Sequence, residues 1–377
     1  MAAKPAATLV DLDDAIAAIG VGTYQYRLLG VIAVLVMTEA MEVNLLAFLS
    51  PCVADAWSLG AVDEASLSSI VFGCSLLGTF FFGWCADRHG RWTVALACAF
   101  LNASCGVLSS SAGRFWVLVA FRGAVGFSLG GTMQPYVMLL EYLPARTRGS
   151  WAMLCSSMAW VLGSMFVYAA AWAVLSVEGW RALVLICALP GWLAFGGLWM
   201  LHESPRWLLS QGRAAEALRV LRAIAATNGG AFEADEITLG GRGGDEREAA
   251  SARASVGELL APSQRATTLT LWALWSCFGF SYYGVVLLIS EAFNNASGDD
   301  DTSCSGFNYA FLFVVATAEG VGDAIAMLCI DTFGRRRLQV LAYLVTALAT
   351  IVLAVGVDGR GAIGKMSSGA RARARAA

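Results

Sequence analysis

Five charged residues lie inside long apolar runs of this sequence, where a charge is costly. Glu39 and Glu42 are three apart and Glu319 and Asp323 are four apart, so each pair shares a helical face. A charge at the centre of a membrane helix costs roughly 2.5–3.5 kcal/mol, so such residues usually line a cavity and pair. We therefore predict that Glu39 or Glu42 approaches Arg122, and that the later acidic pair faces the same cavity. A carboxylate there could take up a proton or bind an organic cation. The alternative for Glu42 is a position near the outer membrane interface, where its carboxylate would reach water.

Aromatic and amide side chains suggest further contacts with a ligand. Tyr282 and Tyr283 follow Trp272 and Trp275 in one apolar run, and such a surface suits a ring-bearing or cationic ligand. The alternative is packing or an interfacial aromatic belt. Gln134 precedes a proline, which would loosen its helix and place an amide donor near the cavity.

The sequence contains few residues that could form the active site of an enzyme. Only His89 and His202 are present, so no histidine-based metal cluster can be assembled. Ser204 has His202 and Glu203 beside it, but neighbours on one turn do not form a nucleophile, base and orienting group. No glycine-rich run ends in the Gly-Lys-Ser/Thr of a nucleotide-binding loop. We predict no enzymatic activity, no metal and no cofactor, and a carrier driven by a substrate or proton gradient.

A charged turn lies between two apolar runs at residues 83–91, and a second copy follows at residues 331–335. The first contains Gly83 and Gly90, which allow a tight turn and a close backbone approach. Asp87 would be stabilised near a neighbouring helix N-terminus. The second copy is the sequence Asp331-Thr-Phe-Gly334-Arg335. Its recurrence suggests two related helical units, each with a tight cytosolic turn.

The arginines of the first turn are candidates for a cytosolic gate. Arg88 and Arg91 can pair with Glu141 or Glu203, and such pairs would close the gate and break when it opens. The alternative is that the arginines only set membrane topology. The remaining gate candidates are Arg148 and Arg206.

Composition indicates a membrane protein. Hydrophobic residues make up 58% of the chain and charged residues 14%, against roughly 25% charged residues in soluble domains. The net charge of -3 argues against a nucleic-acid partner. The 40 glycines suit close helix packing in a lipid bilayer.

The apolar runs are of about the ~20 residues that cross a bilayer. They predict nine spans, at residues 28–50, 67–86, 92–111, 115–140, 151–175, 181–201, 267–290, 307–330 and 338–356. Basic residues fall in alternate short loops, which predicts a multi-pass membrane protein with a cytosolic N-terminus.

The expected organisation is an all-α polytopic protein in five parts. These are a cytosolic N-terminus (1–27), a six-helix bundle (28–201), a cytosolic connector (202–266), a partial three-helix bundle (267–356) and a disordered basic tail (357–377). Arg213 to Ala226 in the connector reads as an amphipathic helix.

Four motifs in order resemble the major facilitator superfamily. They are Gly83-x-x-x-Asp87-Arg88-x-Gly90-Arg91, Arg122-x-x-x-Gly126, Glu141-x-x-Pro144-x-x-x-Arg148-Gly149 and Glu203-Ser-Pro205-Arg206-Trp207. The last two are typical of the sugar-porter and organic-ion branches. Residues 39–42 and 214–229 are most similar to the synaptic vesicle two-related proteins and their aromatic-acid-transporting bacterial relatives.

The resemblance implies two six-helix halves that rock about a central cavity. The second half here has three spans, which we interpret as truncation. The expected function is secondary active transport of a small organic solute, an organic ion or aromatic acid, with a proton as the candidate coupling ion. The alternative is a truncated, non-transporting membrane protein that acts as an interaction or regulatory module.

Overall fold

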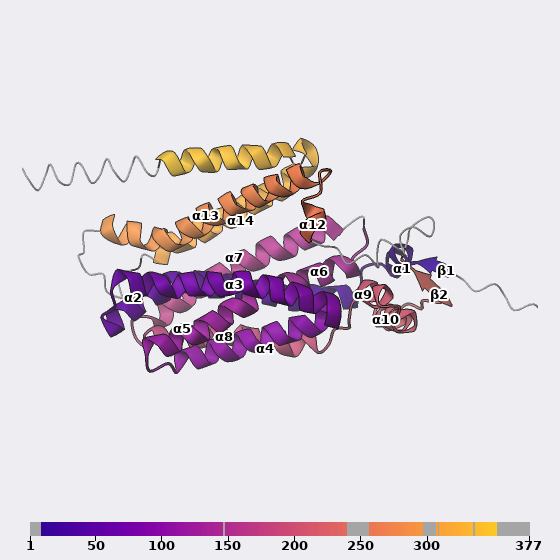
Figure 1. Cartoon of the computed structure of the whole chain (residues 1–377), viewed down its shortest axis with the longest axis horizontal. Coiled ribbons are helices and arrows are strands. Elements are labelled where there is room, and N and C mark those ends of the chain that lie inside the picture. The colour runs from indigo at the N-terminus through magenta and orange to yellow at the C-terminus, as the bar shows by residue number, and fades with distance from the viewer. Residues whose placement is uncertain are drawn as a thin grey trace, which may run out of the picture. The chain divides into compact units, whose positions relative to one another are not determined.

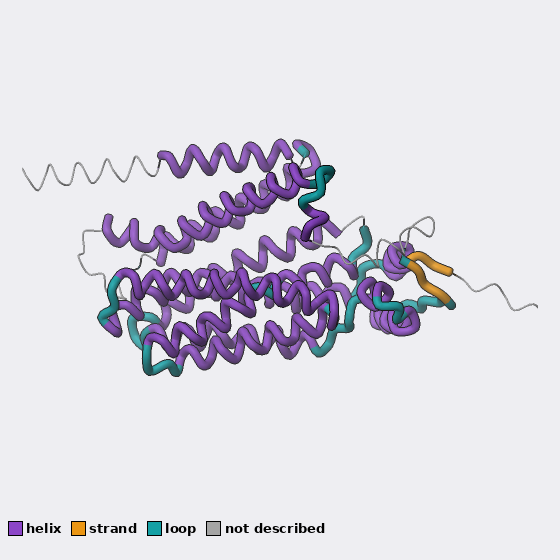
Figure 2. The backbone as a smooth tube through the Cα atoms, viewed as in Figure 1, coloured by secondary structure: helices purple, strands orange, loops and turns teal. Residues whose placement is uncertain are grey.

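The structure is a computed structural model that describes residues 9–145, 148–239, 256–296, 307, 309–334 and 336–352 (Figure 1). The chain forms two compact units, Met1–Gly320 and Val321–Ala377. In the part of the chain that is described, helices dominate and two short strands form the one sheet (Figure 2). The fold is therefore all-α in its membrane part, as predicted. The tail at residues 357–377 lies outside the described residues.

The first six predicted spans all form helices. They are α2 (Thr23–Trp57), α3 (Ala61–His89), α4 (Arg91–Ser110), α5 (Phe115–Leu129) with α6 (Met133–Tyr142), α7 (Arg148–Val174) and α8 (Trp180–Leu198). Three later helices follow, α13 (Arg265–Ala296), α14 (Tyr309–Phe333) and residues 336–352.

Seven helices in the described residues are long and apolar enough to cross a membrane, against the nine predicted spans. They are those of the first six spans and α14. The helix at residues 336–352 and α13 are not among the seven, although both predicted segments are helical.

Glycines let α3 and α5 pack closely. A Cβ atom at Gly126 would overlap the backbone carbonyl oxygen of Val71, and one at Gly78 would overlap that of Phe127. Only glycine allows this approach of two helix backbones, which is how small residues promote association in lipid. The prediction that glycines serve close helix packing is confirmed at this contact.

The fourth span is broken between α5 and α6. Gly131 and Thr132 donate their backbone N–H groups three residues back, to Ser128 and Leu129, at 3.0 and 3.1 Å. Pro135 has no N–H group to continue an α-helical ladder, so the helix tightens and restarts one turn later. The fourth span is thus interrupted just before Pro135, next to the place where the proline after Gln134 is predicted to loosen the helix.

The N-terminal segment and the connector form a small subdomain, which the sequence did not indicate. Strand β1 (Leu9–Asp11) pairs in parallel with β2 (Glu236–Thr238), and α1 (Leu12–Ile19) packs beside them. The connector supplies α9 (Pro205–Ser210), α10 (Ala214–Thr227) and the single turn α12 (Val256–Leu259). We call β1, α1, α9, α10 and β2 the connector subdomain.

The amphipathic helix predicted in the connector is confirmed as α10. Its buried face carries small and aliphatic side chains, which pack on α1 and β2, on α9 and on the start of α2. These buried residues are Ala217, Leu218, Leu221, Ile224 and Ala225.

Candidate functional site

A buried ion pair joins α2 to α5. Arg122 Nη2 donates a hydrogen bond to Glu42 Oε2, and each side chain is only 1% exposed. The predicted approach of an acidic residue to Arg122 is present, and Glu42 is the partner. The alternative position of Glu42 at a wet interface is wrong, because the neighbouring helices bury the carboxylate. In the described residues, Glu42 Oε1 and two guanidinium nitrogens of Arg122 have no hydrogen-bond partner.

Glu39 lies apart from this pair, beside a small cavity of about 20 Å³. Helices α2, α4 and α8 and the break between α5 and α6 surround it. The lining residues are Leu35, Thr38, Glu39, Ala95, Cys98, Ala99, Asn102, Ser128, Leu129, Thr132, Pro135 and Gly191. Gln134 is half-buried in α6 and does not line this cavity. A ligand contact by Gln134 therefore stays a prediction.

A chain of hydrogen bonds links α7 to the later helices α13 and α14. The indole Nε1 of Trp160 donates to the hydroxyl of Tyr282 at 2.6 Å. That hydroxyl donates in turn to Glu319 Oε1 at 3.1 Å. The aromatic residue and the carboxylate predicted for one ligand surface are thus in direct contact.

Of the other two residues predicted for this surface, Tyr283 has a different aromatic partner. Tyr283 packs its ring on Phe72 of α3, with the ring centroids 4.9 Å apart. Asp323 belongs to the second compact unit, so its place at the cavity stays a prediction.

A polar cluster between α2 and α7 escaped the sequence reasoning. The Tyr168 hydroxyl donates to Asn44 Oδ1 at 2.9 Å, and Asn44 Nδ2 donates to Ser164 Oγ at 3.1 Å. Asn44 stands two residues after Glu42 in an apolar run. An amide side chain inside an apolar run could have indicated this cluster, since a buried polar group needs hydrogen-bond partners.

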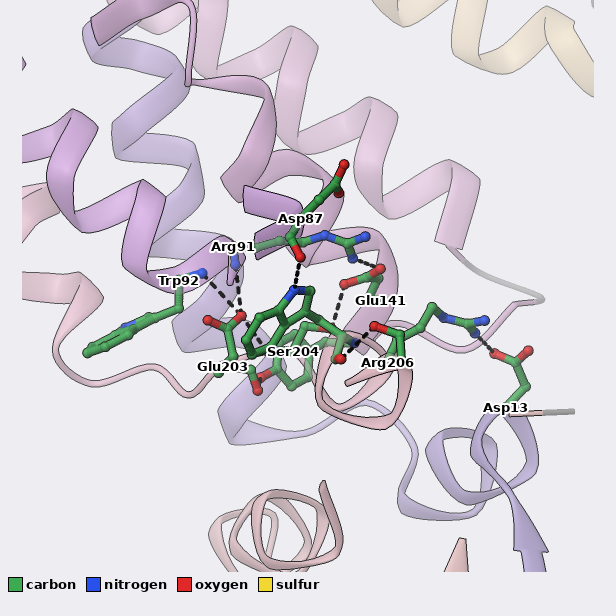
Figure 3. Close-up of polar contacts among 11 residues, drawn as sticks. Asp13, Asp87, Arg91, Trp92, Glu141, Glu203, Ser204 and Arg206 are labelled. Carbon is green, nitrogen blue, oxygen red and sulfur yellow. Dashed lines mark hydrogen bonds and ion pairs between the residues drawn. The ribbon is translucent and has the colours of Figure 1, made fainter. Parts of the chain in front are cut away.

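At one end of the bundle, Glu203 caps the N-terminus of α4 (Figure 3). Its Oε1 accepts hydrogen bonds from the backbone N–H groups of Arg91, Trp92 and Ser204, at 3.0, 3.2 and 2.9 Å. A carboxylate is stabilised here by the orphan N–H groups and the positive end of the helix dipole. The sequence predicts this helix-terminal role for Asp87, but on α4 it belongs to Glu203.

Glu141 holds the guanidinium of the same turn. It forms an ion pair with Arg91 and accepts a hydrogen bond from Ser204 Oγ at 2.5 Å (Figure 3). The predicted Arg91–Glu141 contact is therefore present. Arg88 instead stacks on Trp84 one turn earlier, with its Cζ 5.7 Å from the ring centroid. Its expected pairing with Glu141 or Glu203 is not seen, because its side chain is exposed on the outer face of α3.

The two glycines of this turn behave differently. Gly90 has φ of +100°, and a Cβ atom there would overlap the Glu203 carboxylate. Gly83 lies inside α3, with open space around it, so its expected role in the turn is wrong: α3 continues to His89. The side chain of Asp87 is exposed, and its backbone carbonyl accepts from Trp207 Nε1 at 3.1 Å.

Asp13 of α1 connects the remaining gate candidates. Its Oδ1 accepts from Arg206 Nη2 at 2.7 Å and lies 3.3 Å from Arg148 Nη2. Sequence reasoning missed Asp13, although the acidic cluster at residues 11–14 was visible. The contacts of Asp13 join α1 of the connector subdomain to Arg148 of α7 and Arg206 of α9. The gate role stays a prediction.

The second copy of the turn is only partly described. Gly334 has φ of +79°, which fits a tight turn after α14. The side chain of Asp331 and all of Arg335 lie outside the described residues.

Comparisons with known proteins agree with the fold and with the motifs. The family model described as sugar (and other) transporter matches residues 23–370. The organic cation/carnitine transporter 7 of Arabidopsis thaliana is 31% identical over 87% of this chain and 72% of the relative. The synaptic vesicle 2-related protein of Xenopus laevis is 29% identical over 93% of this chain. This chain spans 65% of the length of that relative.

Solved structures show the same fold. The xylose transporter XylE from E. coli, in a partially occluded inward-open conformation, matches with a TM-score of 0.57 at 20% identity. The match covers 84% of this chain and 75% of that one. The likeness at this identity concerns the fold alone.

Proposed function

Because this chain belongs to the sugar (and other) transporter family, we propose that it is a secondary carrier of a small organic ion. The observation that carries the proposal is the Glu42–Arg122 ion pair, which is fully buried between membrane helices. A buried pair does little for stability compared with well-packed apolar residues of the same volume. Its presence therefore favours a role in the transport cycle.

The pair can couple solute movement to a proton. When Glu42 is ionised, it compensates the charge of Arg122. If Glu42 takes up a proton, Arg122 becomes an uncompensated buried cation, which typically costs about 3–5 kcal/mol. That free energy is enough to shift a two-state equilibrium strongly. Proton uptake would thus drive the bundle toward a state in which Arg122 meets water or an anionic group.

The contact among Trp160, Tyr282 and Glu319 supports an organic cation as the solute. Aromatic faces beside a carboxylate attract a cation that is large and poorly hydrated. The Arabidopsis relative carries organic cation and carnitine in its name. An aromatic acid is the second candidate within the same class of organic ions, and Arg122 is the cation that would meet its carboxylate.

Flux measurements on the purified full chain in proteoliposomes test this function. The probes are radiolabelled carnitine, tetraethylammonium, benzoate and xylose, each with and without a pH gradient. We expect saturable uptake of carnitine or tetraethylammonium, and loss of its response to the gradient in Glu42→Gln. Glu178→Gln is the matched control, because Glu178 is exposed in the loop between α7 and α8.

The outcomes separate a carrier from a non-transporting module. Uptake of every probe at the level of empty vesicles would refute the carrier. If Glu42→Gln still takes up the probe and its response to the pH gradient is unchanged, the ion pair has no role in proton coupling, but the chain is still a carrier.

A further inference from the structure

The segment before the first membrane helix is held on the rest of the connector subdomain by a small apolar surface. Leu12, Ala15 and Ile16 of α1 are buried and pack against α10 and β2. Strand β1 adds three residues of backbone pairing with β2. Because so few side chains are buried, this docking is of the kind that opens locally while the rest of a protein stays folded. We call residues 9–19 the N-terminal clamp.

A glycine hinge follows the clamp. Gly20 ends α1 with φ of +71°, a region that favours glycine, and no described atom lies within 4 Å of a Cβ atom placed there. Two residues later, a Cβ atom at Gly22 would overlap the side chain of Asn228. The Oδ1 atom of Asn228 accepts from the backbone N–H of Tyr24 at 2.9 Å and so anchors the start of α2 to α10. The clamp can therefore swing about Gly20 while α2 stays in place.

One carboxylate of the clamp reaches two arginines on different elements. Asp13 Oδ1 accepts a hydrogen bond from Arg206 Nη2 of α9 at 2.7 Å (Figure 3). It also lies 3.3 Å from Arg148 Nη2 at the start of α7. Among the described residues, Asp13 is the ion-pair partner of both arginines and the only one of either. The clamp thus joins α9 to α7.

Without Asp13, the two guanidinium groups would face each other with like charges, because both contact the same oxygen atom. The two carboxylates nearby are already engaged. Glu141 pairs with Arg91, and Glu203 accepts from backbone N–H groups at the start of α4. Release of the clamp therefore turns an attraction between α9 and α7 into a repulsion. Both side chains are partly exposed, so this effect depends on salt.

The clamp acts on the helix that meets the later part of the chain. Helix α7 begins at Arg148, and about three turns further on its Trp160 donates to Tyr282 of α13. Helices α9 and α10 belong to the connector through which the chain continues to α13. A docked clamp ties this connector to the start of α7, and so it opposes motion of the connector relative to that helix.

We propose that the N-terminal clamp is an autoinhibitory contact. When it is docked through Asp13, it holds the connector on α7 and slows the transport cycle, and its release speeds the cycle. The effect on transport rests on the proposed function. Docking and its dependence on Asp13 do not, because they are contacts within the folded chain.

A disulfide between β1 and β2 tests both parts of this proposal. Leu9 and Glu236 are register partners with exposed side chains. Neighbouring strands place such residues about 4.8 Å apart, which a disulfide can span. The full chain with Leu9→Cys and Glu236→Cys is oxidised in proteoliposomes, and mass spectrometry detects the peptide that joins the two positions.

Uptake of radiolabelled carnitine is then compared before and after oxidation. We expect efficient crosslinking, an uptake rate that is lower by about fivefold or more, and full recovery with dithiothreitol. Leu9→Cys alone is the matched control, because it meets the same reagents without a partner on β2. Oxidation should leave its uptake unchanged.

Hydrogen exchange measures the contribution of Asp13 without a transport assay. Asp13→Asn should raise the exchange rate of the backbone amides of β2 and α9 by about two- to fivefold at low salt, because two partly exposed ion pairs are lost. High salt should remove the difference. Asp14→Asn is the matched control, since Asp14 is exposed and lies in the same first turn of α1. Its exchange should equal that of the unchanged chain, and carnitine uptake should rise in Asp13→Asn only.

Each failure has its own meaning. If no crosslink forms between β1 and β2, the clamp does not dock and the proposal is overturned. Equal exchange in Asp13→Asn and Asp14→Asn would overturn the role of Asp13. A complete crosslink with unchanged uptake would overturn the autoinhibition and keep the carrier. Uptake at the level of empty vesicles in every variant would refute the carrier and with it the inhibition, while crosslinking and exchange would still establish or exclude the docked clamp.

Discussion

The turn between α3 and α4 supports a prediction about two residues that act as one unit. Gly90 has φ of +100° and ψ of +156°, a region that is essentially restricted to glycine. A Cβ atom there would also displace the Glu203 carboxylate. Gly90→Ala should therefore both strain the backbone and remove the cap of α4.

The magnitudes follow from the contacts. Glu203→Ala leaves three backbone N–H groups without their carboxylate. Because Glu203 is half-buried and water can replace part of the cap, we expect a loss of about 2–3 kcal/mol. Backbone strain adds about 1–3 kcal/mol in Gly90→Ala, so this variant should lose about 3–6 kcal/mol. In the Glu203→Ala background, Gly90→Ala should cost only the strain.

A double-mutant cycle on the free energy of unfolding, from denaturant titration in detergent, measures this coupling. We expect an interaction of about 2–3 kcal/mol between the two substitutions, which is the cap loss that they share. Gly83→Ala is the matched control in the same motif, since nothing lies within 4 Å of its added Cβ atom. It should be neutral or stabilising by up to about 1 kcal/mol. Strict additivity, or equal losses at Gly83 and Gly90, would refute the reasoning.

Three further predictions concern the buried pair, the aromatic contact and the connector. Arg122→Leu should destabilise the chain by about 3–5 kcal/mol because the charge of Glu42 is left uncompensated, and adding Glu42→Leu should restore most of the lost stability. Denaturant titration measures both variants. Equal losses in the single and double variants would contradict this prediction. Tyr282→Phe removes a hydroxyl that joins Trp160 to Glu319; unfolding should change by about 1 kcal/mol while carnitine uptake falls about tenfold, and unchanged uptake would remove Tyr282 from the ligand surface. Asp13→Asn should lower the Tm at low salt by an amount that corresponds to about 0.5–1 kcal/mol, and by less at high salt, because its ion pairs are partly exposed; a salt-independent loss would contradict the ion-pair explanation.

The membrane helices and one internal contact could be predicted from the sequence. Hydropathy marks a span because the whole segment must be apolar, so local composition is sufficient. The approach of Glu42 to Arg122 could be predicted because a single charge inside the bilayer has a high free energy, so opposite charges at that depth usually pair. The choice between Glu39 and Glu42 depended on helix rotation, which the sequence leaves open.

The connector subdomain could not be predicted. Leu9 pairs with Glu236 across more than half of the chain, and each strand has only three residues. A run of three residues carries no alternation that distinguishes a strand from a loop. The role of Asp13 depends on this pairing, because β1 places α1 beside Arg148 and Arg206. The cap by Glu203 could not be predicted either. The arginines of the neighbouring turn suggested an ion pair for this carboxylate, and nothing in the sequence marks the backbone N–H groups that it accepts from.

The placement of the polar contacts shows which parts of the first bundle can move as one body. Glu42–Arg122 joins α2 to α5, and Arg91–Glu141 joins α4 to α6. Glu203 fixes the residues after α8 to the start of α4. These contacts hold five of the helices together at two depths, and breaking any one leaves a buried or half-buried charge. A rocking motion that kept these contacts intact would therefore cost less free energy than a motion that opened the bundle.

The hydrogen bonds from Trp160 to Tyr282 and on to Glu319 run instead between this bundle and α13 and α14. The bond between Trp160 and Tyr282 joins neutral groups and contributes about 0.5–1.5 kcal/mol, and the bond to the Glu319 carboxylate contributes about 1.5–3 kcal/mol, less than the cost of breaking a buried ion pair. The low-cost place for rearrangement is thus the aromatic contact at which we place the organic cation.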